Sequence, residues 1–140
     1  MLIVLNITHV DAQEGSYLQA LDELHAGRKR THWIWFIFPQ LTGLGTSAMS
    51  RHYGIANFEE AKAYVDHDLL GPRLNICTLA LLSHPEKSAI EILGLIDATK
   101  VQSCMTLFDA VGDTSSIFRN ALEKLFQGVR DRTTDIMIGK

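Results

Sequence analysis

The residues best suited to chemistry lie in one stretch, where cations and a histidine run into six consecutive apolar residues. They are Arg28, Lys29, Arg30 and His32, followed by 33–38, which holds both tryptophans of the chain. Cationic side chains supply donors for a phosphate or carboxylate. A histidine beside them titrates near neutrality and can carry a proton. The stretch therefore predicts the wall and rim of a pocket that accepts an anion.

We predict that this pocket, built around 27–40 and 43–47, binds a small anionic molecule such as a nucleotide or another phosphate. In an enzymatic version His32 is the catalytic residue that transfers the proton, while Lys29 or Arg73 stabilises charge on a phosphate or carboxylate oxygen. The predicted ligand-binding residues are cations, hydrogen-bonding side chains and one tryptophan: Lys29, Trp33, Gln40, Ser47, Ser50, Tyr53, Arg73 and Lys100.

The same residues have structural interpretations that the sequence leaves open. The cations suit a solvated turn at a helix C-terminus, and His32 can bond to backbone. On a helix Trp33 and Trp35 point about 200° apart, so at most one of them faces a pocket. As an alternative function, the aromatic segment 33–38 binds a partner protein or a second copy of the chain, giving a homodimer without catalysis. A third interpretation places the whole segment in the core.

Other site patterns are weak or missing in the sequence. The segment 43–48 has the glycine spacing of a dinucleotide-binding turn, but such a turn needs a preceding strand and a parallel sheet, which the pattern does not predict. Gly-Lys-Ser/Thr and Gly-x-Ser-x-Gly do not occur, and the six histidines show no zinc-site spacing. We therefore expect neither a metal nor a cofactor.

Composition narrows the class of protein. A chain of 140 residues, 46% hydrophobic and 21% charged, fits one globular domain over 1–140. Its net charge of −3 argues against a dedicated nucleic-acid binder. No apolar run reaches the roughly 20 residues of a membrane span, and 1–5 lacks the flanks of a signal peptide. We expect a cytoplasmic protein without a membrane partner, in which Cys77 and Cys104 are reduced core thiols.

Apolar periodicity predicts an all-α fold, a compact multihelical bundle. Helices are expected at roughly 11–26, from Asn57 to about 69, from about 70 to 83, from Asp97 to near Gly112, and from Ser115 or Ser116 to Gly128. For 33–38 we expect a helix of two turns capped by Thr31. A minor strand pair with 3–5 is the alternative.

A long central motif resembles a catalogued family. The run His32-Trp33-Ile34-Trp35-Phe36-Ile37-Phe38-Pro39-Gln40 is similar to DUF1810, an uncharacterised and mostly bacterial family. Further similar residues are Ala12-Gln13, Gly27-Arg28-Lys29, Gly43-Leu44-Gly45, Ser47, Ser50-Arg51, Tyr53, Glu60-Ala61, Ala63-Tyr64, 70–74, Lys100 and 103–108. The resemblance implies a small, mainly helical cytosolic protein and supplies no catalytic residues. Members are sometimes labelled calpastatin-like, but calpain inhibition is the work of disordered segments, whereas this chain is rich in periodic apolar helices.

Overall fold

The structure, a computed structural model, describes residues 8–45, 47–112 and 116–139. Within these ranges the regular structure consists of helices and one isolated β-bridge, so the predicted all-α fold is confirmed. The helices are α1 (Thr8–Glu14), α2 (Tyr17–Ala26), α3 (Ile34–Ile37), α4 (Ala48–Tyr53), α5 (Phe58–Asp66), α6 (Leu70–Leu81), α7 (Ala89–Leu93), α8 (Leu95–Val111), α9 (Ile117–Phe126) and α10 (Arg132–Met137).

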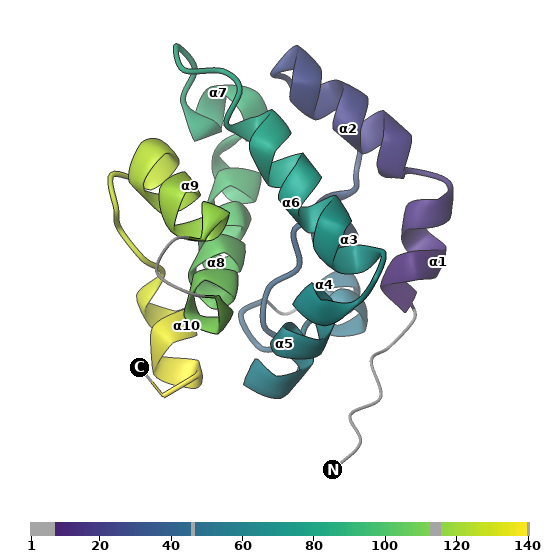
Figure 1. Ribbon diagram of the computed structural model, residues 1–140, viewed down its shortest axis with the longest axis vertical. Coiled ribbons are helices and arrows are strands. Elements are labelled where there is room, and N and C mark those ends of the chain that lie inside the picture. Colours follow the sequence, from purple (N-terminus) through teal and green to yellow (C-terminus); the bar gives the residue numbers. More distant parts are fainter. Residues whose placement is uncertain (1–7, 46, 113–115, 140) are drawn as a thin grey trace.

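Helix α8 is 17 residues long and runs through the middle of the molecule (Figure 1). It packs against α5, α7, α9 and α10. Helices α9 and α10 lie on one side of it, whereas α1 and α2 lie on the other side, beyond α6 (Figure 1). Its buried side chains, among them Val101, Met105 and Phe108, join one apolar cluster with residues from α2, α3, α5, α6, α7 and α9. The core therefore surrounds α8.

Several predicted helix ends are confirmed, because short polar side chains and glycines act locally. The Asn57 side chain accepts from the backbone N–H of Glu60 over 2.9 Å. The Ser116 hydroxyl accepts in the same way from Arg119. Gly27 ends α2 in the left-handed conformation, with a φ of 75°.

Other boundaries differ from the prediction. The helix expected at 11–26 is two helices, α1 and α2, interrupted at Gly15 and Ser16. Asp97 does not cap α8, which begins two residues earlier at Leu95. The pattern missed α4, α7 and α10, because helices of five or six residues are too short to show a period.

The prediction for the aromatic segment was wrong in length and cap. Only Ile34–Ile37 is helical, and the hydroxyl of Thr31 donates to Glu23 instead of capping. Residues 3–5 of the alternative strand pair lie outside the described residues. The β-bridge that the structure does contain joins Leu41 to Ile55 in parallel.

The segment 33–38 is mostly core. Its buried side chains are Trp33, Ile34, Phe36, Ile37 and Phe38, whereas Trp35 is half-buried. Cys77 and Cys104 are free and buried, as predicted. Over the described part of the chain, no helix combines the length and the apolar character that a bilayer span requires.

Candidate functional site

The turn that carries the cations is fixed by the buried carboxylate of Glu23. One oxygen accepts from the backbone N–H groups of Arg30 and Thr31, at 2.6 and 3.0 Å, and from Nε1 of Trp33 at 3.0 Å. The other oxygen accepts from the Thr31 hydroxyl at 2.6 Å. Burial raises the pKa of Glu23, but these hydrogen bonds outweigh it and lower the pKa to about 2. The carboxylate thus holds the turn while charged.

Two lysines share one carboxylate beside this turn. Lys29 Nζ lies 2.9 Å from Oδ2 of Asp97 and donates to the carbonyl of Thr31. Lys100 Nζ lies 3.6 Å from the other carboxylate oxygen. The trio has a formal charge of +1, and the shorter contact belongs to Lys29. Lys100 is therefore the cation whose charge is less fully balanced.

Lys100 also lies over the ring of Trp35, with Nζ 4.7 Å from the ring centroid. This cation–π contact covers one ring face. Trp35 Nε1 is buried, and within the described residues it has no hydrogen-bond partner. Because buried N–H groups normally have a hydrogen-bond partner, the N–H of Trp35 is a donor that can still accept such a partner.

A small cavity adjoins Trp35. Its volume is about 10 Å³, close to what one water molecule needs. Its lining combines apolar side chains with polar ones and consists of Ile34, Trp35, Phe38, Gln40, Ser50, Tyr53, Gly54 and Lys100. The cavity therefore brings together residues from the aromatic segment, from α4 and from α8.

A larger groove lies next to it, which we call the Lys100 groove. It has a volume of about 460 Å³ and shares Gln40 and Lys100 with the small cavity. The glycine loop, the first turns of α8 and the start of α10 form its walls, through Gln40, Gly43, Leu44, Gly45, Leu95, Ile96, Thr99, Lys100, Ser103, Asp131 and Thr133. This volume falls within the range of small-molecule sites.

The β-bridge positions the glycine loop. The N–H of Ile55 donates to the carbonyl of Gln40, and the N–H of Thr42 donates to the carbonyl of Ile55, both over 2.9 Å. Gly54 allows the two segments to approach, because an added Cβ would lie 2.8 Å from Cα of Thr42. Gly43 has a φ of 101°, which an L side chain rarely adopts. The loop wall is therefore set by backbone geometry.

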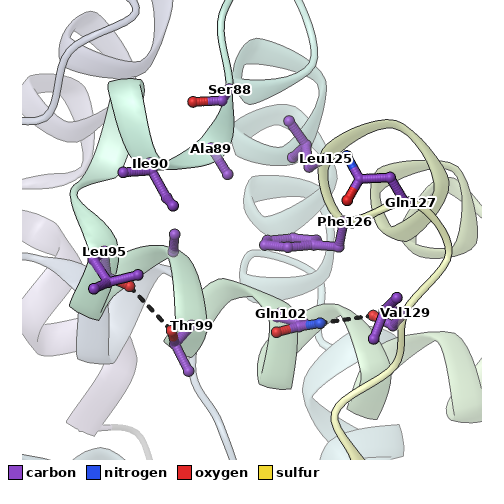
Figure 2. A pocket seen from close by; sticks show the side chains of 11 residues that line it. Ser88, Ala89, Ile90, Leu95, Thr99, Gln102, Leu125, Phe126, Gln127 and Val129 are labelled. Atoms are coloured by element: carbon purple, nitrogen blue, oxygen red, sulfur yellow. Dashed lines mark hydrogen bonds between the residues drawn. The ribbon is translucent and has the colours of Figure 1, made fainter.

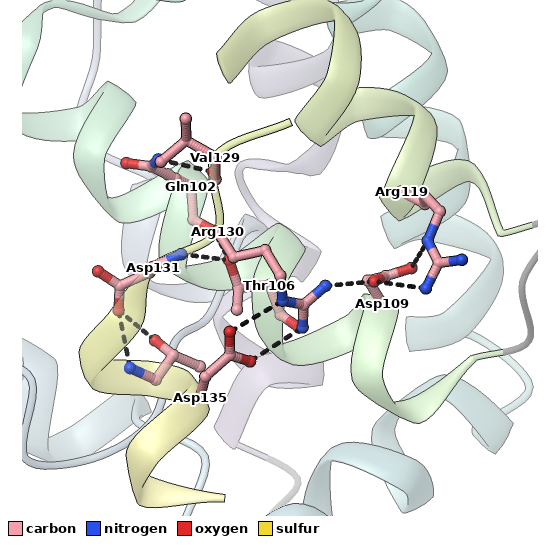
Figure 3. Close-up of polar contacts among 9 residues, drawn as sticks. Gln102, Thr106, Asp109, Arg119, Val129, Arg130, Asp131 and Asp135 are labelled. Atoms are coloured by element: carbon pink, nitrogen blue, oxygen red, sulfur yellow. Dashed lines mark hydrogen bonds and ion pairs between the residues drawn. The ribbon is translucent and has the colours of Figure 1, made fainter. Parts of the chain in front are cut away.

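The α10 wall is held to α8 by a polar cluster around the buried carboxylate of Asp109 (Figure 3). Arg119 and Arg130 both pair with this carboxylate, and Arg130 Nε lies 2.9 Å from Asp135. Hydrogen bonds with Asp135 and Asp109 raise the pKa of Arg130. The N–H of Asp131 donates to the hydroxyl of Thr106. These contacts place Asp131 at the groove.

The structure unites part of the predicted site. Gln40 and Lys100 line the groove, Ser50 and Tyr53 line the small cavity, and Lys29 is linked to Lys100 through Asp97.

The other predicted site residues lie elsewhere. Trp33 is in the core with its N–H on Glu23. Ser47 caps α4 by accepting from the N–H of Ser50. His32 is exposed and lines neither the groove nor the small cavity. Arg73 donates to Gln13 and lies over the ring of Tyr17.

Sequence reasoning missed several residues around the groove. Trp35, not Trp33, is the indole beside Lys100. The predicted Lys100 shares one face of α8 with three groove residues that were not predicted, at helical spacing: Ile96, Thr99 and Ser103. That spacing was readable, but the sequence did not show which loop would cover this face.

Three comparisons with known proteins bear on identity. A family model described as "Protein of unknown function (DUF1810)" matches residues 6–138. The crystal structure of the conserved hypothetical protein Rv1873 from Mycobacterium tuberculosis is similar, with 45% identity, a TM-score of 0.92 and coverage of 94% of each chain. No curated protein matches the chain. With nearly its whole length matched by the family model, the chain belongs to the DUF1810 family.

Proposed function

We propose that the protein binds a small anionic molecule in the Lys100 groove. The main support for this proposal is that Lys29 and Lys100 share the single carboxylate of Asp97. Lys100 lines both the groove and the small cavity, so its incompletely balanced charge faces the space that a ligand would enter. A phosphate or carboxylate oxygen would supply the missing counter-charge.

The hydrogen-bonding groups at this end of the groove support the proposal. The indole N–H of Trp35 is buried and has no partner among the described residues, and Gln40 borders both spaces. Asp131 lies on the α10 wall, where an anion would be repelled. We therefore place the anionic group at the end formed by Gln40 and Lys100.

The proposed function is binding without a proton-transfer step. His32 is exposed and does not line the groove. The alternative of an exposed aromatic docking segment is weakened by the burial of 33–38. Two of the exposed apolar side chains, Leu95 and Ile96 at the start of α8, border the groove instead.

A thermal-shift screen with inorganic phosphate, short carboxylates and nucleotides tests the proposal. A ligand that binds only the folded state raises the melting temperature. At a ligand concentration one hundred times Kd, the free energy of unfolding rises by about 2.7 kcal/mol. We expect one anion class to stabilise the wild type, and Lys100→Ala to abolish the shift. Lys62→Ala, an exposed lysine on α5, is the matched control and should keep it. Equal shifts in Lys100→Ala and the wild type would refute the assignment.

A further inference from the structure

We infer that the anionic ligand is an amphiphile, with a head group at Lys100 and an acyl chain that extends into a second hollow. The inference rests on the proposed function. This second space, which we call the Phe126 hollow, has a volume of about 380 Å³ and lies between α7, α8 and the end of α9 (Figure 2). Ile90 and Phe126 point into it from opposite sides (Figure 2).

The Phe126 hollow adjoins the Lys100 groove. Leu95 and Thr99, one turn apart on α8, line both spaces. The Thr99 hydroxyl donates to the carbonyl of Leu95 over 3.0 Å, so its proton is used within the helix (Figure 2). A ligand that passes from one space to the other meets the side chains of Leu95 and Thr99. The surface of α8 between the two spaces therefore suits an apolar chain.

The hollow favours an apolar occupant. Among the described residues that line it, none is charged. Its polar side chains are largely engaged, because Gln102 donates to the carbonyl of Val129 and Ser88 caps α7. Phe126, Leu125 and Ala98 supply apolar surface. A polar ligand would find few free partners here, whereas an acyl chain needs none.

Exposed apolar side chains gather around the same two spaces. Ile90, Leu95, Ile96 and Val129 are 53%, 66%, 73% and 58% exposed. The junction at Gly94, whose φ is 84°, turns α7 into α8 and sets Ile90 and Leu95 on either side of it. Single exposed apolar residues are ordinary, but a contiguous set beside a hollow marks a binding surface. Covering these side chains would remove them from water.

Charge and shape select an acyl chain over a flat ring or a protein. The cation that lines the groove, Lys100, stands at one end, and the uncharged hollow stands at the other. Lys100 occupies a face of Trp35, so this indole offers less room for stacking a base. Both spaces are concave and of small-molecule size. An anionic head with a flexible apolar tail matches this arrangement.

Isothermal titration with butyrate, octanoate and dodecanoate, each kept below micelle formation, tests the inference. In the wild type we expect affinity to rise roughly threefold to fourfold for each methylene that leaves water. Ile90→Glu places a carboxylate in the hollow and should remove this dependence on chain length. Leu18→Glu is the matched control, because Leu18 is 73% exposed on α2 and should leave binding unchanged.

The outcomes separate the inference from the proposed function. Binding that needs Lys100 but does not vary with chain length would overturn the amphiphile and leave the anion site intact. No binding of any carboxylate or of phosphate would overturn both. Octanoate that binds Ile90→Glu and Lys100→Ala as tightly as it binds the wild type would also overturn both. Dimers that dissociate in Ile90→Glu, without a chain-length effect, would assign the hollow to a second copy of the chain.

Discussion

The indole N–H of Trp33 donates to the carboxylate of Glu23 over 3.0 Å, and both groups are buried. This bond joins the aromatic segment to α2 across the turn that carries Lys29. The same carboxylate oxygen holds the N–H groups of Arg30 and Thr31. Glu23 is therefore the residue that fixes the turn carrying Lys29.

Glu23→Gln should lower the free energy of unfolding by about 2 to 3 kcal/mol at neutral pH. The amide keeps the shape but loses the charge, and hydrogen bonds to a charged acceptor contribute about 1.5–3 kcal/mol. Urea unfolding followed by tryptophan fluorescence measures the change. Asp22→Asn, at an exposed neighbour, should stay within about 0.5 kcal/mol of the wild type. Equal stability of Glu23→Gln and the wild type would contradict a structural role of the charge.

The contribution of Glu23 should depend on pH with a definite sign. Its pKa falls from the ordinary 4.5 to about 2 in the folded protein. A lowered folded pKa gives stability that is present above pH 4.5 and is lost as the pH falls toward 2. The stability difference between wild type and Glu23→Gln should therefore shrink across this window. A difference that stays constant from pH 6 to pH 3 would contradict the assignment.

Arg130→Ala should loosen α10 more than Arg119→Ala does. The buried Asp109 keeps one arginine partner in either variant, but Arg130 also bonds to Asp135 and to the carbonyl of Thr106. Arg130 is about one-third exposed, so its removal should cost less than the breaking of a fully buried ion pair. We expect the free energy of unfolding to fall by about 2 kcal/mol. For the more exposed Arg119 we expect less than about 1 kcal/mol. Urea unfolding measures both losses, and faster hydrogen exchange within 132–137 should accompany the first.

Two glycines should respond to alanine in opposite directions. An added Cβ at Gly54 would crowd the backbone of Ser50 and Thr42, whereas at Gly15 it would meet nothing within 4 Å. Gly54→Ala should therefore destabilise the protein, and Gly15→Ala should be neutral or stabilise it by up to about 1 kcal/mol. The melting temperatures of the two variants, compared with that of the wild type, test this prediction. A Gly54→Ala protein that melts with the wild type would show that the loop and α4 can move apart.

Local signals in the sequence were sufficient for the helix ends and much of the core. Asn57, Ser116 and Gly27 act through bonds within a few residues, so their roles could be read directly. Cys77 and Cys104 were correctly predicted to be core thiols.

The groove could be predicted only in part, because its walls come from three distant segments. Lys100 and Gln40 were named, but nothing in the sequence indicated that 43–45 and the start of α10 would meet the first turns of α8. Trp33 was named instead of Trp35, since which indole N–H already has a partner depends on Glu23, ten residues before Trp33. Long-range pairings of this kind leave no periodic signal.

The charge balance of the two lysines gives the sharpest test of the anion site. Asp97→Asn removes the shared carboxylate and raises the formal charge of the trio from +1 to +2, so phosphate should bind several-fold more tightly. Lys29→Ala leaves Asp97 to Lys100 alone, the formal charge becomes zero, and phosphate should bind several-fold more weakly. At a protein surface such a change in one nearby charge amounts to about 1 kcal/mol or more. Titration calorimetry at low ionic strength measures both, because salt screens the effect. Shifts in the same direction in both variants would show that folding, and not charge, controls the site.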